Sequence, residues 1–280
     1  MNQQIVSVDW LHENQYRENL IILDASPKLT ASSKVSKHPG LTIALARPFR
    51  IKENFSNTES PYPNTIPSAE QFQRGCRELG INHDSEIVIF DNLGIYSSPR
   101  VWWLFNLMGH ENVKVLDGGL PKWISNGYET VADAELEKDY EEGNFKATMQ
   151  SEYLLSYDDI CANINTNEYL IIDARSAGRY QGTAAEPRKT LQSGKIPNSA
   201  NVPYQTILED GKFKSAEEIR KIFAQATNDK LHDLPLAYSC GSGMTACIIM
   251  LASEIAGQES RCLFDGSWTE YAMREGLVKD

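Results

Sequence analysis

The sequence is poor in positive charge. Its 280 residues include 27 lysines and arginines against 38 aspartates and glutamates, which gives a formal net charge of −11 at pH 7. Proteins that bind nucleic acid gather lysine and arginine on one face, because these side chains displace the counterions of the phosphate backbone. We therefore expect no nucleic-acid partner for this chain.

The sequence also lacks a long apolar run. No stretch approaches the roughly 18 to 20 apolar residues that cross a bilayer. The first ten residues, MNQQIVSVDW, have neither the basic nor the apolar part of a secretory signal. We expect a soluble, cytoplasmic protein with no membrane partner.

Cysteines are few, and their number is odd. Disulfide frameworks use even numbers of cysteines, and zinc sites use pairs separated by two to four residues. Neither pattern occurs here, so we expect reduced thiols and no bound metal. The five cysteines are Cys76, Cys161, Cys240, Cys247 and Cys262.

The sequence contains a long internal repeat. LIILDAS (20–26) matches LIIDARS (170–176), about 150 residues further on. The same offset places Asp91 opposite Cys240. A repeat of this length indicates two similar domains, because the repeats of solenoids are roughly 20 to 50 residues long.

Each half alternates short apolar strands with helical patterns, which is typical of an α/β fold with parallel strands. We expect two tandem domains, each a mostly parallel sheet flanked by helices. The predicted first domain covers residues 1–131 and the second covers 152–280. Residues 132–151 are acidic and show no sustained apolar period, which predicts a linker.

Cys240 follows an apolar run and precedes a glycine-rich turn, in LPLAYSCGSGMTACIIMLA (234–252). Ligands of open parallel sheets bind at the carboxyl ends of the strands, where loops lead into helices. Backbone N–H groups of such a loop, together with the helix N-terminus, stabilise a negative charge and hence a thiolate. Cys240 is therefore either a nucleophile or a half-buried thiol that ends a strand.

Three chemistries use loops of this kind. A cysteine phosphatase needs an arginine as the sixth residue after the cysteine, and Ala246 stands there. The dinucleotide-binding pattern GSGMTA (241–246), with Asp265 as the ribose ligand, is a weak match because the repeat makes this the last unit of the second domain. The third chemistry is sulfur transfer through a cysteine persulfide.

Over its full length the chain resembles the two-domain rhodanese-family sulfurtransferases. CGSGMTAC (240–247) is similar to the active loop of the 3-mercaptopyruvate sulfurtransferases in that family. The other motifs that carry the resemblance are VWW (101–103), LDGGLPKW (116–123), DARSAGRYQGTAAEPR (173–188), GKIPNSANVPY (194–204) and DGSW (265–268).

The resemblance implies that only the second domain is catalytic. Cys240 would take the sulfur of a small-molecule donor, 3-mercaptopyruvate, release pyruvate and hold a persulfide. The sulfur would then pass to a small thiol, cyanide or a thioredoxin-like acceptor. Apart from the covalent persulfide, no cofactor is implied.

The resemblance also assigns site residues. Arg179 and Arg188 would bind the donor's carboxylate, and Ser242 would be catalytic together with Cys240. Asn64 stands where relatives carry a histidine, and Glu53 where they carry an aspartate; we assign both a supporting role. The loop backbone would bind the donor, and the side chain of one tryptophan would wall the pocket. These residues are Gly241, Gly243, Met244, Thr245, Ala246 and Trp268.

The donor is inferred from the charge of the loop. Residues 241–245 are uncharged, whereas thiosulfate-preferring relatives carry basic residues after the cysteine. This difference favours a monoanionic 2-oxo acid such as 3-mercaptopyruvate. Two alternatives stay open: a thiosulfate sulfurtransferase with the same nucleophile, and a non-catalytic sulfur carrier, because Asn64 cannot relay a proton.

Other conspicuous residues have structural interpretations. We expect Arg175 to pair with Asp173, and Trp102 and Trp103 to pack in the protein interior. Cys247 falls in a predicted helix and is expected to be a buried structural thiol.

Overall fold

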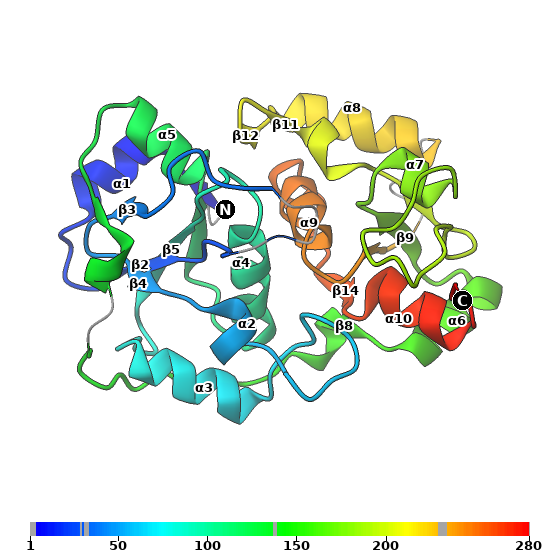
Figure 1. The fold of residues 1–280 in the computed structure, drawn as a ribbon, viewed down its shortest axis with the longest axis horizontal. Helices are drawn as coiled ribbons and strands as arrows, with labels where there is room; N and C mark the ends of the chain where they lie inside the picture. Colours follow the sequence, from blue (N-terminus) through cyan, green and yellow to red (C-terminus); the bar gives the residue numbers. More distant parts are fainter. Residues whose placement is uncertain (1–3, 29, 31–33, 137–138, 229–233, 280) are drawn as a thin grey trace. The chain divides into compact units, whose positions relative to one another are not determined.

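The computed structural model describes residues 4–28, 30, 34–136, 139–228 and 234–279. It divides into two compact units, which are described separately below (Figure 1). Unit 1 comprises Met1–Thr58, Ile66–Gln150 and Asp210–Phe213, and unit 2 comprises Glu59–Thr65, Ser151–Glu209 and Lys214–Asp280. Each unit therefore includes a short segment from the other half of the sequence. Residues 137 and 138 of the predicted linker lie outside the described residues.

Unit 1 contains a five-stranded parallel sheet with the strand order β1-β6-β5-β2-β4. Its strands are β1 (Ile5–Val6), β2 (Leu20–Asp24), β4 (Arg47–Pro48), β5 (Glu86–Phe90) and β6 (Val113–Leu116). A small antiparallel pair consists of β3 (Leu41–Ile43) and β7 (Thr130–Ala132). The helices are α1 (Val8–Asn14), α2 (Ile51–Asn54), α3 (Ala69–Glu78), α4 (Ser98–Leu107), α5 (Gly119–Ser125) and the 3-10 helix η1 (Asp133–Leu136).

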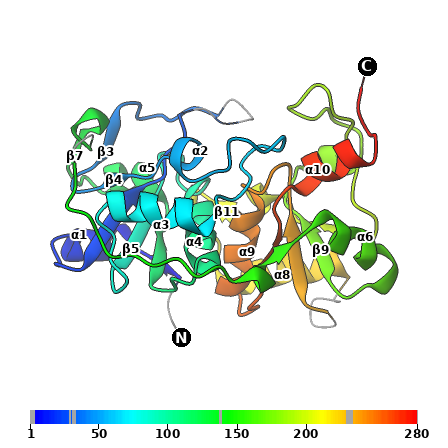
Figure 2. The ribbon, with the colours of Figure 1, turned by 90° about the horizontal axis from the view of Figure 1, so that it is seen from below.

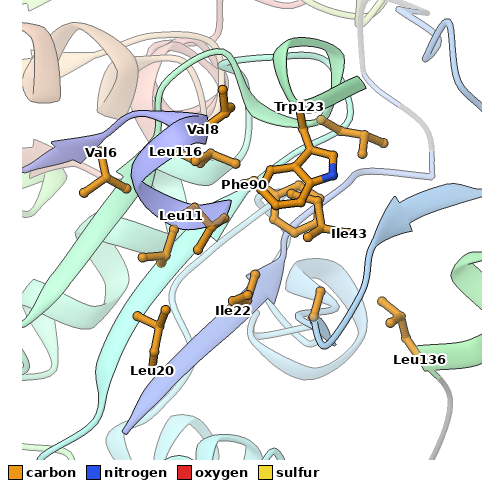
Figure 3. Close-up of a cluster of buried hydrophobic side chains, with 13 residues drawn as sticks. Val6, Val8, Leu11, Leu20, Ile22, Ile43, Phe90, Leu116, Trp123 and Leu136 are labelled. Atoms are coloured by element: carbon orange, nitrogen blue, oxygen red, sulfur yellow. The ribbon is translucent and has the colours of Figure 1, made fainter. Parts of the chain in front are cut away.

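The core of unit 1 follows from the apolar strands of the sequence. All five residues of β2 are buried, as expected for a strand inside a parallel sheet covered on both faces. Apolar residues of α1 and α5 pack on this sheet, and Figure 3 shows the cluster, with Trp123 and Phe90 at its centre. On α4, Trp102 and Trp103 are fully buried, which agrees with their predicted packing role.

Unit 2 contains a second five-stranded parallel sheet, with the strand order β10-β9-β13-β14-β8. Its strands are β8 (Leu154–Leu155), β9 (Leu170–Asp173), β10 (Ala200–Asn201), β13 (Leu236–Ser239) and β14 (Cys262–Phe264). Helices α8 and α9 lie on one side of these strands and α10 on the other (Figure 2). The helices are η2 (Ser151–Tyr153), α6 (Tyr157–Thr166), α7 (Ala177–Tyr180), η3 (Tyr204–Ile207), α8 (Ala216–Thr227), α9 (Ala246–Ile255) and α10 (Ser267–Arg274), and a short strand is β11 (Leu208–Glu209). The short strand β12 (Lys212–Phe213) belongs to unit 1.

The two sheets have the same topology. Written from the opposite edge, the order in unit 2 is β8-β14-β13-β9-β10, and each strand then corresponds to one strand of β1-β6-β5-β2-β4. The central strands are β5 and β13, and each leads through a loop into a buried helix, α4 or α9. The predicted repeat and the predicted α/β class are confirmed.

The loop after β5 surrounds the carboxylate of its first residue, Asp91. Asp91 is completely buried. One carboxylate oxygen accepts the N–H groups of Tyr96, Ser97 and Ser98 at 2.9 Å and the Ser98 hydroxyl at 2.7 Å. The other oxygen accepts the N–H of Leu93 at 2.9 Å. The start of α4 and its preceding loop are therefore organised by one carboxylate.

Replacing this carboxylate should destabilise unit 1. In Asp91→Asn, an NH₂ group takes the place of one acceptor oxygen and faces N–H donors, which should cost about 3 kcal/mol of unfolding free energy. Urea denaturation measures the loss, and amide hydrogen exchange at residues 93–98 locates it. Asp133→Asn, at an exposed position of the same unit, is the control, and an equal effect of both substitutions would contradict the assignment.

Candidate active site

Cys240 is the first residue after the central strand β13 of unit 2. It is buried, with 2% of its surface exposed. Ser239, just before it, pairs with Asp173 at the end of β9, so the two carboxyl ends meet there. The loop then turns at Gly243, whose φ of +75° lies in the left-handed region that glycine adopts readily. Helix α9 begins directly after Thr245.

Ser267, at the start of α10, holds the loop in shape. Its hydroxyl oxygen accepts the N–H of Cys240 and the N–H of Gly243, both at 3.1 Å. The same hydroxyl donates to the Phe264 carbonyl at 2.9 Å. Because one buried oxygen ties both sides of the turn to α10, the position of the thiol depends on Ser267.

The next two residues of α10 bind the loop carbonyls. The N–H of Trp268 donates to the Cys240 carbonyl at 3.0 Å, and the N–H of Thr269 donates to the Gly241 carbonyl at 3.1 Å. The Trp268 side chain is buried, donates from its ring nitrogen to the Gln192 carbonyl at 3.0 Å and lies under the Arg175 guanidinium. Trp268 is thus fixed beside the loop, and its role as a pocket wall stays a prediction.

Several loop N–H groups face no acceptor. Within the described part of the chain, no hydrogen bond has as its donor a backbone N–H of Gly241, Ser242, Met244, Thr245 or Ala246. Counted from the first residues of α4 and α9, the N–H donors of Tyr96, Ser97 and Ser98 that bind the Asp91 carboxylate in unit 1 correspond to the last three of these residues, 244–246. The same donor set is therefore available to an anion beside Cys240.

Cys247 has a different environment from Cys240. It is fully buried on α9, and its thiol donates to the Gly243 carbonyl at 3.3 Å. This bond agrees with the structural role predicted for Cys247.

A network of buried charges lies beside the loop. Arg175 pairs with Asp173 at 2.7 Å and with Glu186 at 2.9 Å, and all three side chains are almost completely buried. The predicted pairing of Arg175 with Asp173 is confirmed. Burial raises the pKa of Asp173, and Arg175 acts in the opposite direction by stabilising the carboxylate.

Arg179 lies against the active loop. Its guanidinium pairs with Glu186 at 2.5 Å. A Cβ atom added to Gly241 would come within 2.8 Å of the Arg179 Nη2 atom. A glycine next to Cys240 is therefore what lets this guanidinium approach the loop.

Arg188 is the second arginine at the site. Its Nη1 atom donates to the Thr269 hydroxyl at 3.3 Å, and within the described residues it forms no ion pair with a carboxylate. Burial lowers the pKa of Arg188, and the charge of the nearby Cys240 opposes this effect. Arg188 is thus a half-buried cation close to the thiol, without an ion-paired carboxylate.

Asn64 reaches Ser242 from the segment Glu59–Thr65 of unit 2. Its side-chain Nδ2 donates to the Ser242 carbonyl at 3.1 Å and to the Ser242 hydroxyl oxygen at 3.0 Å. Glu53 lies in unit 1, on α2, with an exposed side chain, and its supporting role stays a prediction.

Three residues that organise the site were not predicted from the sequence: Ser267, Thr269 and Glu186. Ser267 and Glu186 lie inside the motifs DGSW (265–268) and DARSAGRYQGTAAEPR (173–188). Their hydrogen bonds and ion pairs depend on the tertiary structure, so the motifs alone could not assign them.

The fold and the site together define a class of protein: a tandem α/β protein in which one of two equivalent loops carries a buried thiol among N–H donors and arginines. The sequence model of the rhodanese-like domain matches residues 7–126 and 156–274. The chain belongs to the rhodanese family.

Curated relatives match almost the whole chain. Thiosulfate/3-mercaptopyruvate sulfurtransferase 1 of Arabidopsis thaliana, a mitochondrial protein, is 36% identical over 99% of this chain and 78% of its own length. Thiosulfate sulfurtransferase of Cricetulus griseus is 36% identical over 95% of this chain and 91% of its own length. Among solved structures, the 3-mercaptopyruvate sulfotransferase SseA of Escherichia coli superposes with a TM-score of 0.83 at 30% identity and covers 95% of this chain and 99% of its own.

Among the described residues, no helix combines the length and the apolar character needed to cross a bilayer. Among the same residues, no group of three or more histidine, cysteine, aspartate or glutamate side chains is placed to hold a metal ion.

The role of Ser267 can be tested by removing its hydroxyl. Ser267→Ala leaves the buried N–H groups of Cys240 and Gly243 without this acceptor, which should cost about 1 to 3 kcal/mol for each group. Urea denaturation should show the loss, and the reactivity of Cys240 toward a sulfur donor should fall as the loop loses its shape.

Ser239→Ala is the matched control. The Ser239 hydroxyl is buried next to Cys240 and, within the described residues, has no hydrogen-bond partner. Its removal should cost no stability. Equal losses in the two variants would show that Ser267 has no special role.

Proposed function

We propose that this protein is a 3-mercaptopyruvate sulfurtransferase that works through a persulfide on Cys240. The observation that carries the proposal is the loop beside this thiol. Five of its N–H groups, those of residues 241, 242 and 244–246, have no acceptor within the described residues, while equivalent groups of unit 1 bind a carboxylate. An anionic persulfide on Cys240 would receive these donors.

The first half of the proposed reaction forms one S–S bond and breaks one C–S bond. The Cys240 thiolate attacks the sulfur of the donor, and the electron pair of the C–S bond moves toward the donor's carbonyl as an enolate. The proton of the donor's thiol ends on the methyl carbon, so pyruvate leaves and the enzyme keeps an anionic persulfide. In the second half, cyanide or a thiol attacks the outer sulfur and restores the Cys240 thiolate.

The charges beside the loop suit a monoanionic donor. Arg175 and Arg179 are paired with Asp173 and Glu186, whereas Arg188 forms no ion pair with a carboxylate within the described residues. One such cation matches the one carboxylate of 3-mercaptopyruvate better than the two charges of thiosulfate. The planar guanidinium of Arg188 can bind a carboxylate through two parallel hydrogen bonds.

Thiosulfate is the second candidate donor, because one relative with 36% identity is named for thiosulfate alone and another for both donors. The physiological acceptor, whether a small thiol or a thioredoxin-like protein, stays a prediction, as does the cytoplasmic location. The proposed chemistry needs no metal or organic cofactor, because Cys240 holds the transferred sulfur covalently.

Removing the nucleophile should abolish turnover. Cys240→Ser should release neither pyruvate nor thiocyanate from 3-mercaptopyruvate and cyanide, and it should lack the 32-dalton adduct that intact mass spectrometry detects as a persulfide. Cys161→Ser, at a half-buried cysteine on α6, should behave like the wild type. Pyruvate release by Cys240→Ser at the wild-type rate would refute the proposal.

The two donors can be distinguished by kinetics. We expect a higher kcat/KM for 3-mercaptopyruvate than for thiosulfate, and a roughly 10-fold to 100-fold rise in KM for 3-mercaptopyruvate in Arg188→Met, because hydrogen bonds to charged groups contribute about 1.5 to 3 kcal/mol. Lys189→Met, at an exposed neighbour, is the control. A clear preference of the wild type for thiosulfate would favour the second candidate. Multiple turnovers with either donor would exclude a carrier without catalysis.

A further inference from the structure

The contact between Asn64 and Ser242 restricts the direction in which the Ser242 hydroxyl donates its hydrogen bond. A backbone carbonyl can only accept hydrogen bonds, so the Asn64 atom 3.1 Å from the Ser242 carbonyl is the donor nitrogen Nδ2. The same nitrogen lies 3.0 Å from the Ser242 hydroxyl oxygen. Because Nδ2 carries only donors, the hydroxyl accepts from Asn64 and its own proton points to a different group.

The segment that carries Asn64 is itself fixed in unit 2. Tyr62 contacts Arg274 of α10 through its hydroxyl, at 3.4 Å, and Thr65 donates to the Tyr62 carbonyl at 2.9 Å. Asn64 adopts a φ of +62°, in the left-handed region that asparagine tolerates better than most residues. This conformation presents the amide to the active loop.

We propose that Asn64 is a positioning residue that directs the Ser242 proton to the carbonyl oxygen of the donor. The inference rests on the proposed function. When the C–S bond of the donor breaks, negative charge develops on that oxygen, and a hydroxyl whose proton is already directed there stabilises the charge. Ser242 then acts as a hydrogen-bond donor and not as a base.

The side chain of Asn64 does not titrate. The hydrogen bond from Ser242 to the donor's carbonyl therefore does not depend on the protonation of an imidazole at this position. The described residues of unit 2 include no histidine. The charged or titratable groups on the surrounding elements are Glu59, Tyr62, Arg179, Arg188, Cys240, Cys247, Asp265, Glu270, Tyr271 and Arg274. The orientation of the Ser242 proton should therefore not change as imidazole titrates between about pH 6 and pH 7.

The test separates the two half-reactions. Asn64→Gly removes the amide and keeps a residue that adopts positive φ. It should slow the single-turnover release of pyruvate from 3-mercaptopyruvate about 3-fold to 10-fold, the effect of one hydrogen bond. Discharge of a preformed persulfide by cyanide involves no donor carbonyl and should change less than 2-fold. Asn198→Gly is the matched control, because Asn198 has a φ of +59° and donates its amide to the Ile164 carbonyl.

Two further variants make the test decisive. In a Ser242→Ala background, Asn64→Gly should add no further loss. Asn64→His should introduce a new ionisation near pH 6.5 in the rate of pyruvate release, which the wild type and Asn198→Gly lack. Equal slowing of both half-reactions by Asn64→Gly, or additive losses with Ser242→Ala, would overturn the inference and leave the persulfide mechanism standing. Absence of pyruvate release by the wild type would refute the proposed function itself.

Discussion

The need to satisfy backbone N–H groups at the start of a buried helix shapes both halves of this protein. The first N–H groups of any helix have no partner within it, and α4 and α9 are buried from their first residues. Unit 1 meets the need with the Asp91 carboxylate, which accepts four N–H groups and one hydroxyl. Unit 2 has a thiol at the equivalent place, and in the proposed reaction its loop donors bind the sulfur that Cys240 acquires. The same architecture therefore places a carboxylate among the loop donors in one copy and a thiol in the other.

Backbone N–H groups without an acceptor are unfavourable, so neighbouring residues must hold the active loop in this conformation. Ser267 ties both sides of the turn to α10, and the Trp268 N–H binds the Cys240 carbonyl. Glu186 binds both Arg175 and Arg179 from a nearly inaccessible position, which fixes the second guanidinium over the loop. The hydrogen-bond donors for the persulfide would then be in place before the reaction. Donors placed in advance in this way stabilise the negative charge that develops in an enzyme's transition state.

The sequence predicted those features that depend on strand periodicity, repeats and short motifs. The two α/β sheets, the thiol at Cys240 and the opposition of Asp91 to Cys240 could all be read from it. The hydrogen bonds to Asp91 could not be predicted, because most of their donors are backbone N–H groups, which every residue type except proline carries. Ser267 and Glu186 stand in motifs, yet their partners lie far away along the chain. Supporting roles for Asn64 and Glu53 came from the resemblance alone, and the structure supplies a contact for Asn64.

The position of Asn64 gives the first, non-catalytic repeat a part in the proposed active site. In sequence, Asn64 belongs to the first repeat, between β4 and α3. In space, its segment Glu59–Thr65 is a part of unit 2, where it binds Ser242 and contacts α10. A chain reduced to its second half would keep Cys240 and both arginines but would lose the group that directs the Ser242 proton. The proposed active site is thus completed by the first half of the sequence, which carries Asp91 at the position equivalent to Cys240.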